Sequence, residues 1–137
     1  MSMATKHERM VVANLVIEAI SQFGRQFFLH KGRVSKFELD SRGRLWFIDG
    51  YTQRRIYVAY EGKWRGFTEG GTLRDLIKNL GGFIRSGDPI RRRFGPWPEW
   101  ICDGDLWGYG ESMGALRARL EAIIPQSAWA KKAEAEK

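Results

Sequence analysis

The sequence predicts an α+β fold in one domain: a helix, then an antiparallel sheet, then two further helices. Three observations lead to this prediction. Apolar residues near the N-terminus recur every three or four positions, the pattern of an amphipathic helix. From Arg33 to Phe67 they alternate with polar residues, as in half-buried strands. The helical spacing then returns twice, on either side of a segment rich in Gly, Pro and Trp.

The first helix is expected from Glu8 to about Phe23, where Gly24 is placed to end it. Residues 1–6 before it are expected to form a loose terminus. The apolar residues that define the helical stripe are Val11, Val12, Leu15, Val16, Ala19, Ile20 and Phe23.

A four-stranded antiparallel meander is expected next, because the apolar period changes and the intervening turns are short. Ser41–Arg42–Gly43 and Glu61–Gly62 have the length and the glycine typical of hairpin connections. The expected strands are Arg33–Asp40, Arg44–Asp49, Arg55–Tyr60 and Lys63–Phe67.

Two helices are expected in the C-terminal half, separated by a long loop at residues 86–111. Thr72 is a suitable N-cap for the first of them, and Gly81–Gly82 is expected to weaken or kink it. The second is expected from Ser112 to about Ile124, before Pro125. The 137 residues are thus interpreted as one domain with a core at 8–125, and residues 1–6 and 128–137 are expected to be flexible.

Positive charge is concentrated in the middle of the chain. The formal net charge is +7, and residues 25–93 carry 16 of the 23 Lys and Arg residues but 7 of the 16 Asp and Glu. Twelve of those 16 cations are arginine, whose planar fork binds phosphate and stacks on bases. A GC-rich genome would also raise the arginine content, so this preference by itself does not establish a ligand.

Alternation along the strands places cations and aromatic rings on one sheet face and apolar residues on the other. Cations that neutralise phosphates beside rings that stack on bases form a recurring nucleic-acid platform. The first hypothesis is therefore a non-enzymatic nucleic-acid-binding module, with DNA and RNA both open. The alternative is an ordinary solvated or covered sheet face. The candidate contact residues are Arg44, Trp46, Arg55, Tyr57, Lys63 and Arg65 on the sheet and Arg91, Arg92 and Arg93 in the long loop.

A second hypothesis is a small protein-interaction module, such as an accessory inhibitor or adaptor of a phage or plasmid. The acidic, aromatic segment 94–111 would bind the protein partner, because exposed Trp and Tyr side chains often anchor such interfaces. The alternative is that these rings fill the core. The candidate anchors are Trp97, Trp100, Trp107 and Tyr109.

Catalysis and metal binding are the least favoured hypotheses about function. An enzyme would be built around Asp103, Asp105 and Glu111, but the spacing after Asp103 does not match a calcium loop. The single cysteine, Cys102, lies between apolar residues and resembles a buried hydrophobe more than a nucleophile. No cofactor or metal is therefore expected. With one cysteine and no apolar run near the length of a membrane span, a cytoplasmic protein without a membrane partner is expected.

Overall fold

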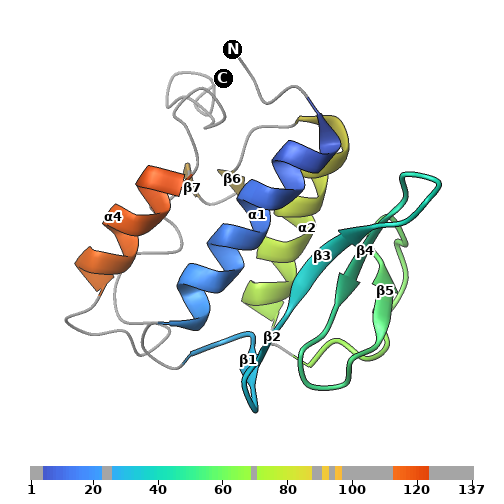
Figure 1. The fold of residues 1–137 in the computed structure, drawn as a ribbon, viewed down its shortest axis with the longest axis horizontal. Coiled ribbons are helices and arrows are strands. Elements are labelled where there is room, and N and C mark those ends of the chain that lie inside the picture. Colours follow the sequence, from blue (N-terminus) through green and yellow to red (C-terminus); the bar gives the residue numbers. More distant parts are fainter. Residues whose placement is uncertain are drawn as a thin grey trace.

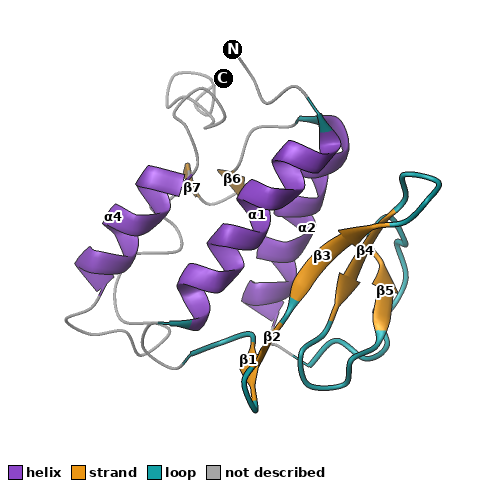
Figure 2. Cartoon of the chain, in the orientation of Figure 1, coloured by secondary structure: helices purple, strands orange, loops and turns teal. Residues whose placement is uncertain are grey.

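The computed structural model describes residues 5–22, 26–68, 71–87, 91–92, 95–96 and 113–123. It has the α+β class that the sequence predicts (Figures 1 and 2). Its helices are α1 (Lys6–Ser21), α2 (Gly71–Ser86) and α4 (Met113–Ile123). Its strands are β1 (Leu29–His30), β2 (Arg33–Val34), β3 (Lys36–Leu39), β4 (Leu45–Ile48), β5 (Arg55–Tyr57), β6 (Arg91–Arg92) and β7 (Gly95–Pro96).

The main sheet has three antiparallel strands in the order β3–β4–β5. The expected first strand, Arg33–Asp40, is divided at Ser35 into β2, which pairs with β1, and β3, which pairs with β4. The turn at residues 41–43 forms as expected, with Gly43 at a φ of +77°. Its amide donates a hydrogen bond to the Asp40 carbonyl, as in a three-residue hairpin loop closed by a glycine bulge.

The prediction of a fourth strand at Lys63–Phe67 is wrong. That segment contains a turn instead of a strand. Gly66 has a φ of +89°, and the amide of Phe67 donates to the carbonyl of Trp64. A strand would place positions 64 and 67 on opposite faces. The turn instead brings the two rings together, with centroids 5.8 Å apart, and lets Phe67 pack against the ring of Phe47 at 5.6 Å.

The core lies between the inner face of the sheet and the helices. Figure 1 shows α1 between α2 and α4, with the sheet on the side of α2. As alternation predicts, Leu45, Phe47 and Ile56 point inward. They meet buried side chains of all three helices, among them Val16, Ile17, Ile20, Leu76, Ile77, Leu80, Leu116 and Leu120.

Helix α1 begins earlier than expected. Thr5 is its N-cap, and the Thr5 hydroxyl accepts a hydrogen bond from the Glu8 amide while the Glu8 carboxylate accepts one from the Thr5 amide. This reciprocal capping satisfies backbone donors that a helix start leaves free. Lys6, expected in a loose terminus, therefore stands in the first turn of a capped helix.

Helix α2 runs without a break from Gly71 to Ser86, through the glycine pair expected to weaken it. Gly81 lies against Val58, and a Cβ atom on residue 81 would come within 2.5 Å of the Val58 side chain. The glycine thus allows the helix to approach the sheet closely.

The outer edge of β3 is covered by α1. The Asn14 side chain donates to the Phe37 carbonyl at 3.1 Å and accepts from the Phe37 amide at 2.7 Å. These are the bonds that a neighbouring strand would make.

A buried carboxylate organises the loop between β4 and β5. Asp49 is 1% exposed, and its oxygens accept hydrogen bonds from the amides of Tyr51, Thr52 and Thr68 and from the Thr68 hydroxyl. The turn after β4 is thereby tied to the segment that leads into α2.

Candidate nucleic-acid interface

Four of the residues expected on the outer sheet face lie together, and we call Arg44, Trp46, Arg55 and Tyr57 the aromatic–arginine cluster. Trp46 and Tyr57 are direct cross-strand partners with ring centroids 5.3 Å apart. The Arg55 guanidinium carbon lies 4.3 Å from the Trp46 ring centroid, and that of Arg44 lies 5.8 Å from it. Both distances are in the range of cation–π contacts. The cluster thus presents flat groups and positive charge from two strands.

Asp40 holds this cluster in place. Its Oδ2 atom accepts a hydrogen bond from the Trp46 indole at 3.0 Å and one from Arg44 Nε at 2.8 Å. Its Oδ1 atom accepts from the amides of Arg42 and Arg44. These bonds, led by that from Trp46, hold the pKa of the Asp40 carboxyl well below its usual range. Asp40 therefore fixes both the turn and the tryptophan ring.

The outer face also carries a second carboxylate. β3 places Glu38 opposite Trp46 in the register, and Glu38 forms an ion pair with Lys36 at 3.3 Å. The acidic side chain at this edge makes the face less uniformly basic than the alternation of β4 and β5 alone indicates.

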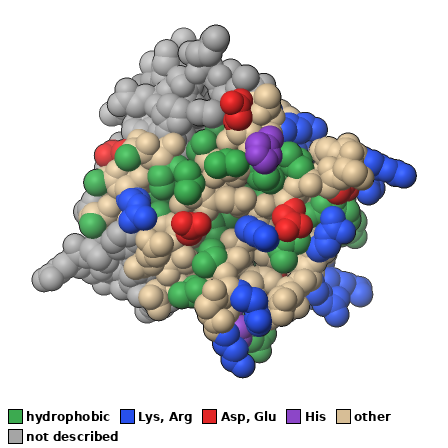
Figure 3. All heavy atoms as spheres, in the orientation of Figure 1, with side chains coloured by type: hydrophobic (Ala, Val, Ile, Leu, Met, Phe, Trp, Pro, Cys, Tyr) green, Lys and Arg blue, Asp and Glu red, His purple; other side chains and the backbone are tan. Residues whose placement is uncertain are grey.

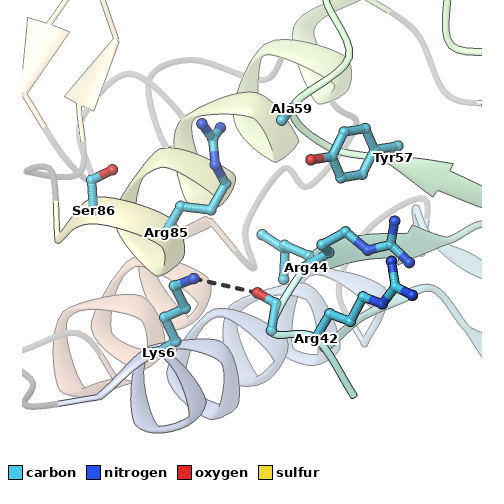
Figure 4. Close-up of a pocket in the computed structure, with 9 residues that line it drawn as sticks. Lys6, Arg42, Arg44, Tyr57, Ala59, Arg85 and Ser86 are labelled. Atoms are coloured by element: carbon cyan, nitrogen blue, oxygen red, sulfur yellow. Dashed lines mark hydrogen bonds between the residues drawn. The ribbon is translucent and has the colours of Figure 1, made fainter. Parts of the chain in front are cut away.

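A pocket of about 290 Å³ lies beside the cluster (Figure 4). Its walls come from the first turn of α1, the β3–β4 turn, the end of β5 and the C-terminal end of α2. Among the described residues that line it, every charged one is a cation: Lys6, Arg42, Arg44 and Arg85. Tyr57 lines it too, so the pocket and the cluster are continuous.

Two expected contact residues do not join the cluster, because the fourth strand does not form. Lys63 lines a separate, more open pocket of about 490 Å³ with Trp64, Phe67 and Arg74. There the Arg74 guanidinium carbon lies 5.3 Å from the Trp64 ring centroid. Arg65 is exposed in the turn that replaces the strand.

Of the other expected contact residues, the structure describes only the backbone of Arg91 and Arg92. Arg91 and Arg92 form β6, whose backbone pairs with β7. Arg93 of the basic loop lies outside the described residues. The same holds for the expected protein-binding residues Trp97, Trp100, Trp107 and Tyr109. It also holds for the residues weighed for catalysis or metal binding, Cys102, Asp103, Asp105 and Glu111.

The pocket adds cations that the face pattern did not single out. Lys6 is expected in a loose terminus, although the Thr5–Glu8 spacing is a capping-box signature that places it in a helix. Arg42 is expected only as part of the Ser41–Arg42–Gly43 turn, and the alternation of the strands gives Arg85 no place on the sheet face. No sequence pattern brings Lys6 close to Arg85, because their proximity depends on how α1 and α2 pack.

Lys and Arg side chains gather over the sheet side of the molecule and around the tip of the β1–β2 hairpin (Figure 3). Within the described ranges, no three His, Cys, Asp or Glu side chains are grouped closely enough to hold a metal ion. None of the helices in that part of the chain is long and apolar enough to cross a membrane.

No curated protein and no solved structure matches the chain significantly. A family model described as YoqU matches residues 4–122. The matched span covers most of the 137 residues and includes both the aromatic–arginine cluster and the basic pocket. The chain therefore belongs to the YoqU family.

Proposed function

We propose that this protein is a non-enzymatic nucleic-acid-binding module that uses the outer face of its sheet. One observation carries the proposal: an exposed aromatic–arginine cluster adjoins a pocket that four cations and no carboxylate line, among the residues that the structure describes. Phosphate neutralisation and base stacking are the two interactions from which sequence-tolerant nucleic-acid affinity is built. Both are available here within one continuous surface.

Within this surface Tyr57 is the group best placed to meet a base. Its side chain is 41% exposed and stands at the junction of the cluster and the pocket. Arg55 covers Trp46 at 4.3 Å, so a base would stack on the guanidinium plane or displace it. Arginine planes accept bases much as aromatic rings do.

The competing interpretation is a solvated sheet face whose arginines simply pair with its rings. In that case nearby carboxylates would balance the cations, as Asp40 balances Arg44 and Glu38 balances Lys36. Arg42 and Arg85 have no such partner among the residues that the structure describes. The unbalanced charge beside the rings supports binding of an external anion.

The test is a fluorescence-anisotropy titration of the full chain with labelled duplex DNA, single-stranded DNA and RNA at about 50 and 200 mM salt. Affinity that falls steeply with salt is expected. Arg55→Gln should weaken binding about three- to tenfold. Arg54→Gln is the matched control, because it removes the same charge one position away, where the side chain lies against Gly66. Its effect should stay within about twofold.

Tyrosine variants separate stacking from charge. Tyr57→Ala should lower affinity about tenfold, in line with ~1–3 kcal/mol for one stacked base. Tyr60→Ala is the control, because Tyr60 is similarly exposed (56%) but lines neither the cluster nor the pocket. Absence of binding at the lower salt, or equal losses for both tyrosine variants, would contradict the proposal.

The second hypothesis, binding of a protein partner through segment 94–111, stays a prediction. Capture of one specific protein by the full chain, lost in Trp97→Ala and Trp107→Ala variants that retain the wild-type fold, would favour it. Together with a failed titration, that result would replace the nucleic-acid proposal.

A further inference from the structure

The pocket beside the cluster has the composition of an anion site. Lys6 comes from α1, Arg42 and Arg44 from the β3–β4 turn, and Arg85 from the end of α2. Residues that are far apart in sequence thus line one space of about 290 Å³. That volume is at the small end of ligand pockets, which suits a small charged group.

Among the described residues, a carboxylate pairs with one of the four cations that line the pocket. Asp40 is bonded to Arg44 Nε, while the other three cations form no ion pair within the described residues. Lys6 donates one hydrogen bond, at 3.3 Å, to the Gly43 carbonyl. An ammonium group has three donors, so Lys6 is held over the turn and still has donors for a ligand.

The arrangement leaves a space between the sheet and α2. In Figure 4 the Tyr57 hydroxyl points into the gap between β5 and the helix that carries Arg85, and the guanidinium groups of Arg42 and Arg44 extend together at the outer side. Ser86, on the same helix end as Arg85, adds a hydroxyl to the lining. Hydroxyl donors and guanidinium forks are the usual protein partners of a phosphate oxygen.

We propose that this pocket binds one phosphate group of a nucleic-acid strand, with the neighbouring unpaired base against the ring of Tyr57. The proposal deepens the proposed function and rests on it for the source of the phosphate. Tyr57 determines the preferred ligand: its hydroxyl faces the pocket and its ring faces the cluster, so one nucleotide can contact both. A base in a duplex is stacked and paired, so the single-stranded form is expected to bind more tightly.

The first experiment tests the pocket without any nucleic acid. Inorganic phosphate is titrated into the full ¹⁵N-labelled chain, with chloride at matched ionic strength as the control. The amides of Arg42, Gly43 and Ser86 and the Nε–H signals of Arg42 and Arg85 should shift together and saturate. Shifts that match those in chloride, or that spread evenly over all the arginines, would overturn the phosphate site.

The second experiment tests the strand as the source of the phosphate. Arg42→Gln and Arg85→Gln should each weaken binding of single-stranded DNA about three- to tenfold and reduce the salt slope by about one. Arg119→Gln is the control, because Arg119 is an exposed arginine on α4 whose side chain contacts Gln22 rather than the sheet. It should change the affinity by less than about twofold.

The outcomes separate this inference from the proposed function. If the wild-type chain binds strands but Arg42→Gln and Arg85→Gln behave like Arg119→Gln, the pocket inference is overturned and the sheet-face proposal stands. If phosphate saturates the pocket but no strand binds, the proposed function and the strand source are overturned, and the ligand is a free phosphate. Tighter binding of duplex than of single strands would overturn the contact of Tyr57 with an unpaired base.

Discussion

Gly81 in α2 packs so closely against Val58 that a methyl group at position 81 would come within 2.5 Å of Val58 Cγ1. The glycine is therefore a packing requirement rather than a weak point of the helix. Val58 directly follows β5, and both residues are buried. The contact sets how closely α2 approaches the strand that carries Tyr57.

Gly81→Ala should destabilise the protein by about 1–3 kcal/mol, the usual cost of overpacking a core. This is opposite in sign to helix propensity, which favours Ala over Gly by about 1 kcal/mol. Urea unfolding followed by circular dichroism measures the change. In a Val58→Ala background the same substitution should become neutral or stabilising. An equal loss in both backgrounds would mean that another contact explains the glycine.

Asp49→Ala should destabilise the protein by about 2–4 kcal/mol, because it removes a buried acceptor and leaves several part-buried donors without their partner. The affected groups are the amides of Tyr51, Thr52 and Thr68 and the Thr68 hydroxyl. Asp75→Ala on the exposed side of α2 is the control and should stay within about 0.5 kcal/mol. Thermal unfolding of both variants checks the difference, and similar melting temperatures would contradict the role given to Asp49.

Stability should depend on the ionisation of Asp40. The Trp46 and Arg44 hydrogen bonds lower its folded-state pKa below the ordinary value of about 3.9. The unfolded chain therefore takes up the proton first as the pH falls, and the contribution of Asp40 is full above about pH 4 and is lost below it. Melting temperatures of wild type and Asp40→Asn should differ most at neutral pH and converge in acid. A constant gap at every pH would refute this.

Lys31→Asn should stabilise the β1–β2 hairpin by about 0.5–1 kcal/mol. Lys31 and Gly32 both have positive φ, +50° and +79°, between the paired residues His30 and Arg33. That is the two-residue turn for which Asn–Gly is the preferred sequence. Lys31→Val, which also removes the charge, should instead destabilise the turn because β-branched residues avoid positive φ. Chemical denaturation of the two variants should give shifts of opposite sign.

Local periodicity predicted much of the fold. The alternation in β4 and β5 gives the correct inward face for Leu45, Phe47 and Ile56, and the same alternation brings Arg44, Trp46, Arg55 and Tyr57 together on the outer face. The Ser41–Arg42–Gly43 turn was predictable because glycine marks the position with positive φ. The binding role of these side chains stays a prediction.

The features that could not be predicted depend on contacts between distant segments. Residues 63–67 have an alternating pattern, yet the turn at Gly66 lets Trp64 and Phe67 share one side. The pocket requires Lys6 and Arg85 to meet through helix packing, which no local period encodes.

The two hydrogen bonds between Asn14 and Phe37 also occupy backbone groups at one edge of the sheet. An open strand edge is a template for pairing with another molecule. At the edge of β3, the Asn14 side chain makes the two backbone hydrogen bonds of Phe37 that a neighbouring strand would make. Protection of this edge therefore depends on the docking of α1. If α1 were undocked, the amide and carbonyl of Phe37 would be left unpaired at this edge, so the helix covers a strand edge as well as contributing to the core.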